Sequence, residues 1–464
     1  MAIATERRQF AVVDPADESV IDVLGSARPA DGIAAVDAAE AAAAGWAARA
    51  PRDRAEILRR AFDMMTARTE EVAHLIVREM GKPLPEARGE TAYAAEFLRW
   101  FSEEAVRANG DFAIAPSGAN RMLVAHAPVG IALLITPWNF PAAMATRKLG
   151  PALAAGCTVV LKPAQETPLT ALAIAGIMEE AGVPPGVVNV VCTDEPAPLV
   201  ETILGDPRVR KLSFTGSTEV GRRLLGLCAP RVINASMELG GNSPFLVLAD
   251  ADLDVAIAGA MAAKMRNGGE ACTAANRFLV HESVAEDFTA GLTAAMAAVR
   301  VGNGFSEDAQ LGPLINAAAR DKIERLVADA ADRGARVRTG GERLPGAGYF
   351  YPPTVLDQVQ RGSAMLAEEV FGPVAPIMTF TDDDEALGLA NDTEHGLVAF
   401  VFSRDLRRAM AVGERIETGM VGLNRGVVSD PAAPFGGAKQ SGIGREGGHH
   451  GLLEFLEPKY FAFD

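Results

Sequence analysis

The hydrophobic pattern of the chain changes near residue 121. Before that point, residues 33–109 are predicted to be mainly helical, because apolar positions recur at spacings of three and four in stretches such as "RAEILRRAFDMMTARTEEVAHLIVREM". After it, short apolar runs such as "VGIALLIT" and "TVVLKP" alternate with helical segments. Alternating strands and helices are typical of parallel βαβ units, so the pattern predicts an α/β fold behind a helical N-terminal lobe.

The alternation returns after residue 240, in "SPFLVLA", "DLDVAIAGAMAAKM", "NRFLVHE" and "LVAFVFS". A chain of 464 residues exceeds the usual size of one hydrophobic core. We therefore expect a second α/β domain that begins near residue 240, with a cleft at the boundary, near "ELGGNSP".

Composition and charge exclude several functions. A net charge of −16 argues against binding to nucleic acid or anionic lipid, which depends on clustered Lys and Arg. The apolar stretches are broken before the ~20 residues that a membrane helix needs, and the first residues show no signal-peptide pattern. Four scattered cysteines form no disulfide framework, so the expected location is a reducing cytoplasm. Only His449 and His450 are close together among six histidines, without further ligands at suitable spacing, so no metal is expected.

One cysteine lies in an unusual context. Cys272 stands in "KMRNGGEACTAANR", whereas the contexts of the other three cysteines suggest small apolar side chains in a core. The pair Gly268 and Gly269 is expected to offer a mobile backbone whose free N–H groups could lower the pKa of a thiol or bind an oxyanion. From these residues alone, Cys272 is either a nucleophile or a structural thiol.

Two glycine motifs were considered as nucleotide sites. "GIGREG", at 442–447, fits GxGxxG but lies too near the end of the sequence for a βαβ unit to follow, and it is rejected. "KLSFTGSTEVGRRLL" instead combines an apolar strand, a glycine turn and a helix, so residues 216–221 could present a helix N-terminus to a phosphate.

Four further motifs carry a resemblance to a known family. They are "TPWNFP" (136–141), "LKPAQETP" (161–168), "MELGGNSP" (237–244) and "EEVFGPV" (368–374), with "NGGEAC" between the last two. In this order, over nearly the whole chain, they resemble the aldehyde dehydrogenase superfamily. "PFGGAKQSGIGREGG" is similar to its succinate-semialdehyde dehydrogenase branch.

The resemblance implies an α/β fold of three parts. A modified Rossmann domain for the cofactor is expected at 1–109 and 129–239, and an α/β catalytic domain at 240–444. A small β oligomerisation element is expected at 110–128 and 445–464, where members of the family pair subunits. A homodimer or a homotetramer is therefore expected.

The resemblance also implies a covalent mechanism. Cys272 would add to an aldehyde as a thiolate, after which hydride leaves for a nicotinamide cofactor. The Asn139 amide and the Cys272 backbone N–H would hold the oxyanion, and Glu238 would be the base that activates water for thioester hydrolysis. The residues by themselves leave alternatives, since Asn139 could cap a helix that begins at Pro141 and Glu238 could be a plain strand-end acid.

The cofactor is expected to be NADP or NAD. Gln165 stands where NAD-preferring relatives usually have a glutamate, and its neutral side chain favours NADP, although the neighbouring Glu166 could take that place after a small loop shift. The residues that the resemblance assigns to the cofactor are Trp138, Lys162, Gln165, Gly216, Ser217, Glu369 and Phe371.

The expected substrate carries a second negative group. By resemblance, Arg147, Arg266 and Ser429 hold the remote carboxylate of succinate semialdehyde, and guanidinium groups suit a carboxylate because they offer forked, permanently charged donors. The alternatives are a dehydrogenase of glutarate semialdehyde or of an uncharged aldehyde. If the two arginines instead lie on helix surfaces, they would only form salt bridges.

Overall fold

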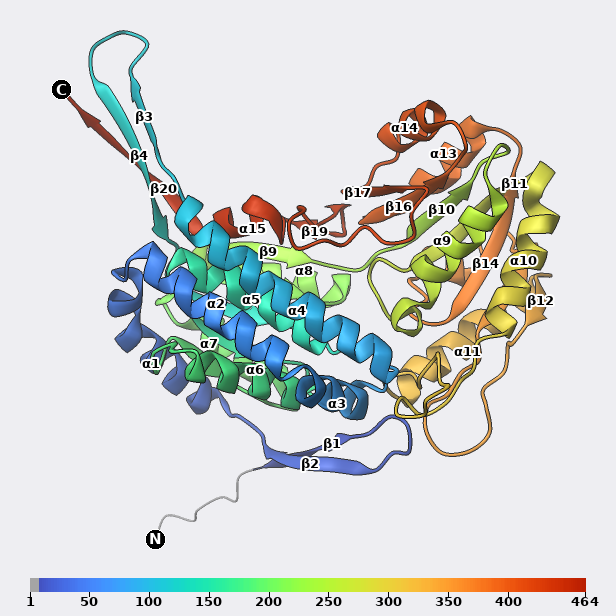
Figure 1. The fold of residues 1–464 in the computed structure, drawn as a ribbon, viewed down its shortest axis with the longest axis horizontal. Helices are drawn as coiled ribbons and strands as arrows, with labels where there is room; N and C mark the ends of the chain where they lie inside the picture. The colour runs from blue at the N-terminus through green and yellow to red at the C-terminus, as the bar shows by residue number, and fades with distance from the viewer. Residues whose placement is uncertain (1–7) are drawn as a thin grey trace.

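The structure is a computed structural model that describes residues 8–464 (Figure 1). After the hairpin of β1 (Gln9–Val13) and β2 (Val20–Gly25), the chain forms a helical lobe. Its helices are α1 (Pro29–Ala47), α2 (Pro51–Ala67), α3 (Thr69–Met80) and α4 (Leu84–Glu104), followed by the short η1 (Ala105–Arg107). The predicted helical N-terminal lobe is confirmed.

A six-stranded sheet follows, with the order β19-β9-β8-β5-β6-β7. All neighbours are parallel except β19, which runs antiparallel to β9. The strands are β5 (Ile131–Ile135), β6 (Thr158–Lys162), β7 (Val188–Val190), β8 (Val209–Thr215), β9 (Asn234–Glu238) and β19 (Gly442–Ile443). The helices between them are α5 (Pro141–Ala155), α6 (Pro168–Glu180), α7 (Pro196–Gly205), α8 (Thr218–Cys228) and η2 (Ala229–Arg231).

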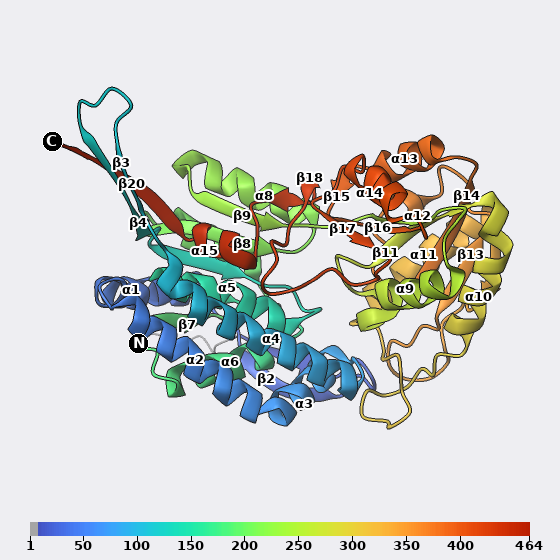
Figure 2. The ribbon, with the colours of Figure 1, turned by 45° about the horizontal axis from the view of Figure 1, so that its top comes forward.

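Helices cover both faces of this sheet, which explains the continuous apolar runs in its strands. Alternate residues of β5 enter two different cores: Ala132 and Leu134 pack with α4 and α5, and Leu133 packs with α7 and α8. Every residue of α5 is buried. Figure 2 shows α4 and α5 over the sheet on the side of α2.

A seven-stranded sheet forms the second α/β part, with the order β12-β13-β14-β11-β10-β16-β17. Only the edge strand β12 is antiparallel to its neighbour. The strands are β10 (Ser243–Val247), β11 (Ala275–His281), β12 (Arg336–Thr339), β13 (Thr354–Asp357), β14 (Val374–Phe380), β16 (Val398–Phe402) and β17 (Met420–Leu423). The helices are α9 (Leu253–Met265), η3 (Arg266–Gly269), η4 (Glu282–Val284), α10 (Ala285–Ala297), α11 (Ala317–Asp332), α12 (Ala364–Ala367), α13 (Asp383–Asn391) and α14 (Leu406–Glu414).

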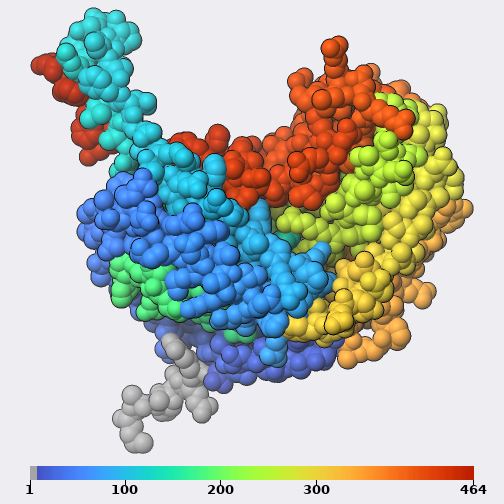
Figure 3. All heavy atoms as spheres, in the orientation of Figure 1, coloured from blue at the N-terminus to red at the C-terminus, as the bar shows by residue number. Residues whose placement is uncertain are grey.

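A three-stranded sheet forms an arm that projects from the body (Figures 1 and 3). It joins β3 (Asp111–Ile114), β4 (Arg121–Pro128) and β20 (Leu456–Phe463) in the order β20-β4-β3. Phe112 and Ile114 on the arm are 63% and 64% exposed. The small pair β15 (His395–Gly396) and β18 (Ala438–Lys439) and the helix α15 (Gly448–Leu453) complete the fold.

The domain boundaries remain a prediction, although each sheet draws most of its strands from one of the three predicted parts. Residues 1–7 of the predicted cofactor domain lie outside the described residues. No helix in residues 8–464 is both long and apolar enough to cross a membrane.

The arrangement of the sheets brings several loops together. The carboxyl ends of β5, β8 and β9 lead into the loops at 136–140, 216–217 and 239–242. The loop that leads into β11 comes from the second α/β part and faces them. Ligands of open parallel sheets bind at such carboxyl ends, so the fold places a site between the two parts.

Candidate active site

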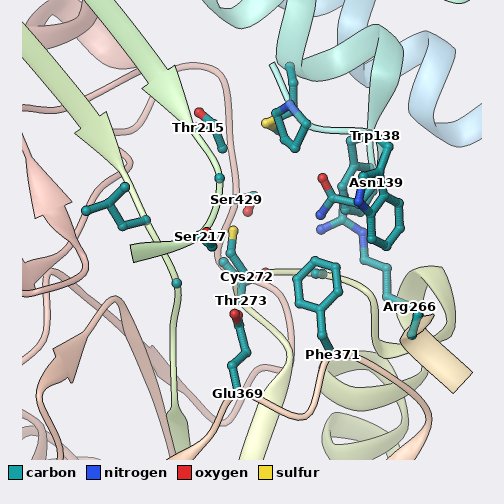
Figure 4. A pocket seen from close by; sticks show the side chains of 18 of the residues that line it. Trp138, Asn139, Thr215, Ser217, Arg266, Cys272, Thr273, Glu369, Phe371 and Ser429 are labelled. Atoms are coloured by element: carbon teal, nitrogen blue, oxygen red, sulfur yellow. The ribbon is translucent and has the colours of Figure 1, made fainter. Parts of the chain in front are cut away.

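A cavity of about 400 Å³ lies where these loops meet (Figure 4). Leu239 and Gly240 line it, which confirms the cleft expected near residue 240. Ten of the thirteen predicted site residues also line it: Trp138, Asn139, Arg147, Gly216, Ser217, Arg266, Cys272, Glu369, Phe371 and Ser429. Glu238, Lys162 and Gln165 do not.

Close backbone packing shapes the loop before Cys272. Gly268 and Gly269 have φ angles of 62° and 76°, in the left-handed region that favours glycine. A Cβ at Gly269 would lie 2.2 Å from the carbonyl oxygen of Gly372, and one at Gly241 would lie 2.4 Å from that of Cys272. Gly269 is needed because two main chains are in contact there, whereas the expected mobility of this backbone stays a prediction.

The Cys272 thiol is half-buried and lies in the centre of the cavity (Figure 4). Burial, together with the negative charges of Glu369 and Glu238, raises its pKa to about 12, while Arg147 acts in the opposite direction. The expectation that the local backbone would lower this pKa is wrong for the free protein. Without a ligand, the thiol is protonated at neutral pH.

Asn139 is held from several sides. Its amide Nδ2 donates to the carbonyl oxygen of Glu270 at 2.9 Å. Its backbone carbonyl oxygen accepts hydrogen bonds from Lys82 Nζ at 2.9 Å and from Asn267 Nδ2 at 3.0 Å. Because Nδ2 carries two protons, one remains available for an oxygen atom in the cavity.

The helix-cap alternative for Asn139 is wrong. The N-cap of α5 is Phe140, and Glu90 of α4 satisfies the first turn instead. Its carboxylate accepts from the backbone N–H groups of Ala142 and Ala143 at 2.9 and 3.2 Å. Glu90 also forms a buried ion pair with Lys82. Sequence reasoning missed both residues, because an acid and a lysine near a helix start carry no sign of a distant partner.

Glu238 ends β9, as its strand-end position predicted, but it is not among the residues that line the cavity. A Cβ at Gly436 would lie 2.8 Å from its Oε1, and its Oε2 is buried without a hydrogen-bond partner in the described part of the chain. Burial and the charge of Glu446 hold its pKa well above the usual range, against the opposing effect of Lys148 and Arg147. The unpaired Oε2 therefore remains available to accept a hydrogen bond.

One end of the cavity combines an acid with aromatic rings. Glu369 Oε1 accepts a hydrogen bond from Gly241 N at 3.2 Å, and burial raises the pKa of Glu369 to about 7. Phe371 meets Trp138 edge to face, with ring centroids 5.4 Å apart. These groups line the part of the cavity beside Cys272, which is called the slot below (Figure 4).

The glycine turn after β8 borders the same slot. Ser217 caps α8 by accepting from Val220 N at 3.4 Å. A Cβ at Gly216 would come within 2.5 Å of the Phe214 ring. The turn therefore needs glycine, and it presents the N-terminus of α8 to the cavity, as an anionic ligand group requires.

Lys162 and Gln165 are not among the residues that line the cavity; Lys162 ends β6 and Gln165 lies in the loop that follows. Lys162 Nζ is buried and donates to the carbonyl oxygen of Pro163 at 2.9 Å, which leaves two ammonium protons for other acceptors. Gln165 is exposed, whereas Glu166 is half-buried. Burial raises the pKa of Glu166, against the opposing effects of Lys162 and a hydrogen bond with Gln165. Gln165 and Glu166, either of which could contact an adenosine ribose, thus lie next to each other on one loop.

The two predicted arginines have different surroundings. Arg147 is 3% exposed, so it does not lie on a helix surface. Its guanidinium carbon lies 4.1 Å from the centroid of the Phe435 ring, and its Nε is buried without a hydrogen-bond partner in residues 8–464. Arg266 lies 4.9 Å from the Phe140 ring and forms no ion pair within the described chain. The surface salt-bridge alternative is therefore wrong for both.

Tyr93 and Phe435 are cavity residues that sequence reasoning missed. Tyr93 lies within an amphipathic helix, where an aromatic residue ordinarily indicates core packing. Within residues 8–464, no group of three or more His, Cys, Asp or Glu side chains could hold a metal ion, and all four cysteines are free.

The raised thiol pKa generates a pH prediction for the free protein. Because only the thiolate reacts, alkylation of Cys272 by iodoacetamide should accelerate about tenfold per pH unit from about pH 7 to about pH 10. Mass spectrometry of the Cys272 peptide measures the rate, and Cys272→Ala identifies labelling elsewhere. A plateau near the ordinary thiol pKa of about 8.5 would contradict the prediction.

Comparisons with known proteins agree with this geometry. The sequence model of the aldehyde dehydrogenase family matches residues 2–461. A succinate-semialdehyde dehydrogenase of Paenarthrobacter nicotinovorans is 58% identical over 96% of this chain and 98% of its own. A glutarate-semialdehyde dehydrogenase of Pseudomonas aeruginosa is 46% identical over 97% and 93%. The crystal structure of an Escherichia coli NADP-dependent enzyme superposes with a TM-score of 0.97 at 45% identity, over 98% of this chain and 94% of its own. The chain belongs to the aldehyde dehydrogenase family.

Proposed function

We propose that this enzyme oxidises succinate semialdehyde to succinate with NADP or NAD. The observation that carries the proposal is the pair Arg147 and Arg266, which line the same cavity as Cys272, with Arg147 buried and Arg266 half-buried. Arg147 approaches the carboxylate of Glu446 only to 3.7 Å, beyond hydrogen-bond distance. Two positive charges on one cavity wall favour a ligand with an anionic group. The 58% identical relative carries the same activity in its name.

The first chemical step is assigned to Cys272. Its thiolate attacks the aldehyde carbon, the carbonyl π electrons move to oxygen, and a thiohemiacetal forms. The free Asn139 N–H and the Cys272 backbone N–H stabilise the negative oxygen. A nicotinamide bound in the slot would supply a hydride acceptor, which would allow the thiohemiacetal held by Cys272 and Asn139 to lose hydride and become a thioester.

The base for the second step is assigned to Glu238. Water must lose a proton as it attacks the thioester, and a carboxyl group with a raised pKa accepts that proton more readily near neutral pH. Glu238 does not line the cavity, so this role requires its side chain to turn before it reaches the water.

The residues around the slot fit a nicotinamide cofactor. Glu369 offers a carboxylate for ribose hydroxyls, Trp138 and Phe371 offer apolar faces, and Gly216 and Ser217 offer a helix N-terminus for the pyrophosphate. Lys162, with two free ammonium protons, is the proposed contact of the adenosine ribose.

Assembly and location are part of the same proposal. The projecting arm exposes Phe112 and Ile114, and an exposed apolar β surface of this kind favours pairing with another subunit. We infer a homodimer or a homotetramer built through residues 110–128 and 445–464. The free cysteines support action in a reducing cytoplasm.

The glutarate-semialdehyde relative supports a second candidate. Glutarate semialdehyde places its carboxylate one methylene further from the aldehyde, and its dehydrogenase from Pseudomonas aeruginosa is 46% identical to this chain. A comparison of kcat/KM for the two semialdehydes separates the candidates, because one methylene shifts the carboxylate relative to Arg147 and Arg266.

Glu238→Gln should separate the two chemical steps. The variant is expected to release about one equivalent of reduced cofactor per active site and then stall, because only hydrolysis of the thioester requires the base. Rapid-mixing absorbance at the reduced nicotinamide band measures the burst. Cys272→Ala should give no burst, and a normal steady-state rate in Glu238→Gln would show that the base lies elsewhere.

Arg266→Ala should reduce activity toward the charged aldehyde selectively. Loss of one charge-assisted contact is expected to lower kcat/KM for succinate semialdehyde, with a cost of about 1.5–3 kcal/mol in the activation free energy. The kcat/KM for the methyl ester of the same aldehyde should stay nearly unchanged. Arg404→Ala removes an exposed arginine outside the cavity and is the matched control. An equal loss for both aldehydes would mean that Arg266 does not bind the carboxylate.

Gln165→Glu tests the cofactor assignment. The native enzyme should use NADP at least as well as NAD, and the introduced carboxylate should lower kcat/KM for NADP by repelling its 2′-phosphate. Both cofactors are measured in both enzymes at one aldehyde concentration. Strong NAD preference in the native enzyme would instead assign the ribose contact to Glu166.

A further inference from the structure

One tyrosine contacts both arginines of the cavity. Tyr93 lies on α4 and lines the cavity. Its hydroxyl oxygen accepts a hydrogen bond from Arg147 Nη2 at 2.5 Å. The guanidinium carbons of Arg147 and Arg266 each lie 5.8 Å from the centroid of its ring. Tyr93 therefore stands between the two charges that the proposed function assigns to the remote carboxylate.

Arg147 has an acidic neighbour that could draw it away from the cavity. Its Nη1 lies 3.7 Å from Glu446 Oε2, which is longer than a hydrogen bond. The other oxygen of Glu446 accepts from Lys148 Nζ at 2.6 Å. Glu446 Oε2 is buried and has no hydrogen-bond partner in residues 8–464. The short contact with Tyr93 thus keeps Arg147 from closing on an acceptor that is otherwise vacant.

The hydroxyl proton of Tyr93 is not used by this contact. A guanidinium group can only donate, so the tyrosine oxygen is the acceptor and its own proton points elsewhere. The described structure shows no acceptor for that proton. A carboxylate is an acceptor only, and it is the kind of group that can use the Tyr93 proton and the two guanidinium groups together.

We propose that Tyr93 determines the preference for aldehydes with a distal carboxylate, by holding Arg147 away from Glu446 and by donating its hydroxyl proton to that carboxylate. The inference rests on the proposed function, because it assigns a further residue to the same subsite. Tyr93 on α4 would thus join Arg147 on α5, Arg266 on η3 and Ser429 as a contact of the substrate carboxylate.

Tyr93→Phe removes the oxygen and keeps the ring. The ring packs edge to face with Phe97, with centroids 5.0 Å apart, and this packing does not involve the hydroxyl. Without the hydroxyl, Arg147 should move toward Glu446. The substrate carboxylate should then lose the Tyr93 donor and part of its contact with Arg147. An uncharged aldehyde uses neither contact.

The experiment compares succinate semialdehyde with its methyl ester, which keeps the chain and removes the charge. In Tyr93→Phe the ratio of kcat/KM for acid over ester should fall about tenfold, mostly through the KM of the acid. Tyr349→Phe, which removes a hydroxyl outside the cavity, should keep the native ratio. A similar change for both aldehydes, or no change for either, would overturn the proposal.

A second variant tests how the hydroxyl acts. In Tyr93→Phe/Glu446→Gln the acceptor that draws Arg147 away has lost its charge, so part of the acid preference should return relative to Tyr93→Phe. General losses from the Glu446 change cancel in the ratio, because both aldehydes share the chemical steps. If the ratio of kcat/KM for acid over ester stays at the Tyr93→Phe value, Tyr93 does not act by holding Arg147 away from Glu446.

The native enzyme separates this inference from the proposed function. If the native enzyme shows no preference for the acid over the ester, the carboxylate subsite itself is wrong. If the native enzyme prefers the acid and Tyr93→Phe keeps that preference, only the assignment of Tyr93 fails.

Discussion

The buried ion pair between Lys82 and Glu90 joins the parts on which the site depends. Glu90 satisfies the first turn of α5, and Lys82 donates to the backbone oxygen of Asn139, so one pair fixes both the helix start and the loop before it. Asn267 extends the connection to the cysteine loop through the same oxygen. A buried pair is stable only while every member is hydrogen-bonded, and removing one partner leaves a charge without solvent. The positions of Asn139 and Cys272 relative to each other therefore follow from contacts made outside the cavity.

The charges around Cys272 oppose one another. Burial and neighbouring acids raise the pKa of the thiol, while Arg147 favours its ionised form. Arg147 also favours the ionised form of Glu238 and approaches Glu446, so one guanidinium group lies near Glu238, Cys272 and the proposed carboxylate subsite. A substrate anion that binds Arg147 would change the electric field at both Glu238 and Cys272. Under the proposed function, substrate binding is therefore linked to the ionisation of these two side chains.

The sequence predicted the elements better than the contacts between them. Alternating apolar runs identified strands such as β5 and β6 because both faces of their sheet are covered. The role of Gly269 could not be predicted, since it depends on the main chain at Gly372, about a hundred residues away. The contact of Glu238 with Gly436 was not predicted either, because the two residues are about two hundred positions apart in the sequence. Tyr93 carries no local signal at all, since its partner Arg147 lies on a different helix.

The pairing of β20 with β4 has a consequence for synthesis. The ribosome makes residues 456–463 long after residues 121–128, yet Leu456 to Phe463 pair with Pro128 to Arg121. Gly442 likewise pairs with Glu238, and Glu446 lies near that residue. The N-terminal parts can fold as they emerge, but the surroundings of Glu238 and the third strand of the arm wait for residues 442–463. A nascent chain that has not yet reached residue 442 therefore holds Cys272 before the partners of Glu238 are in place.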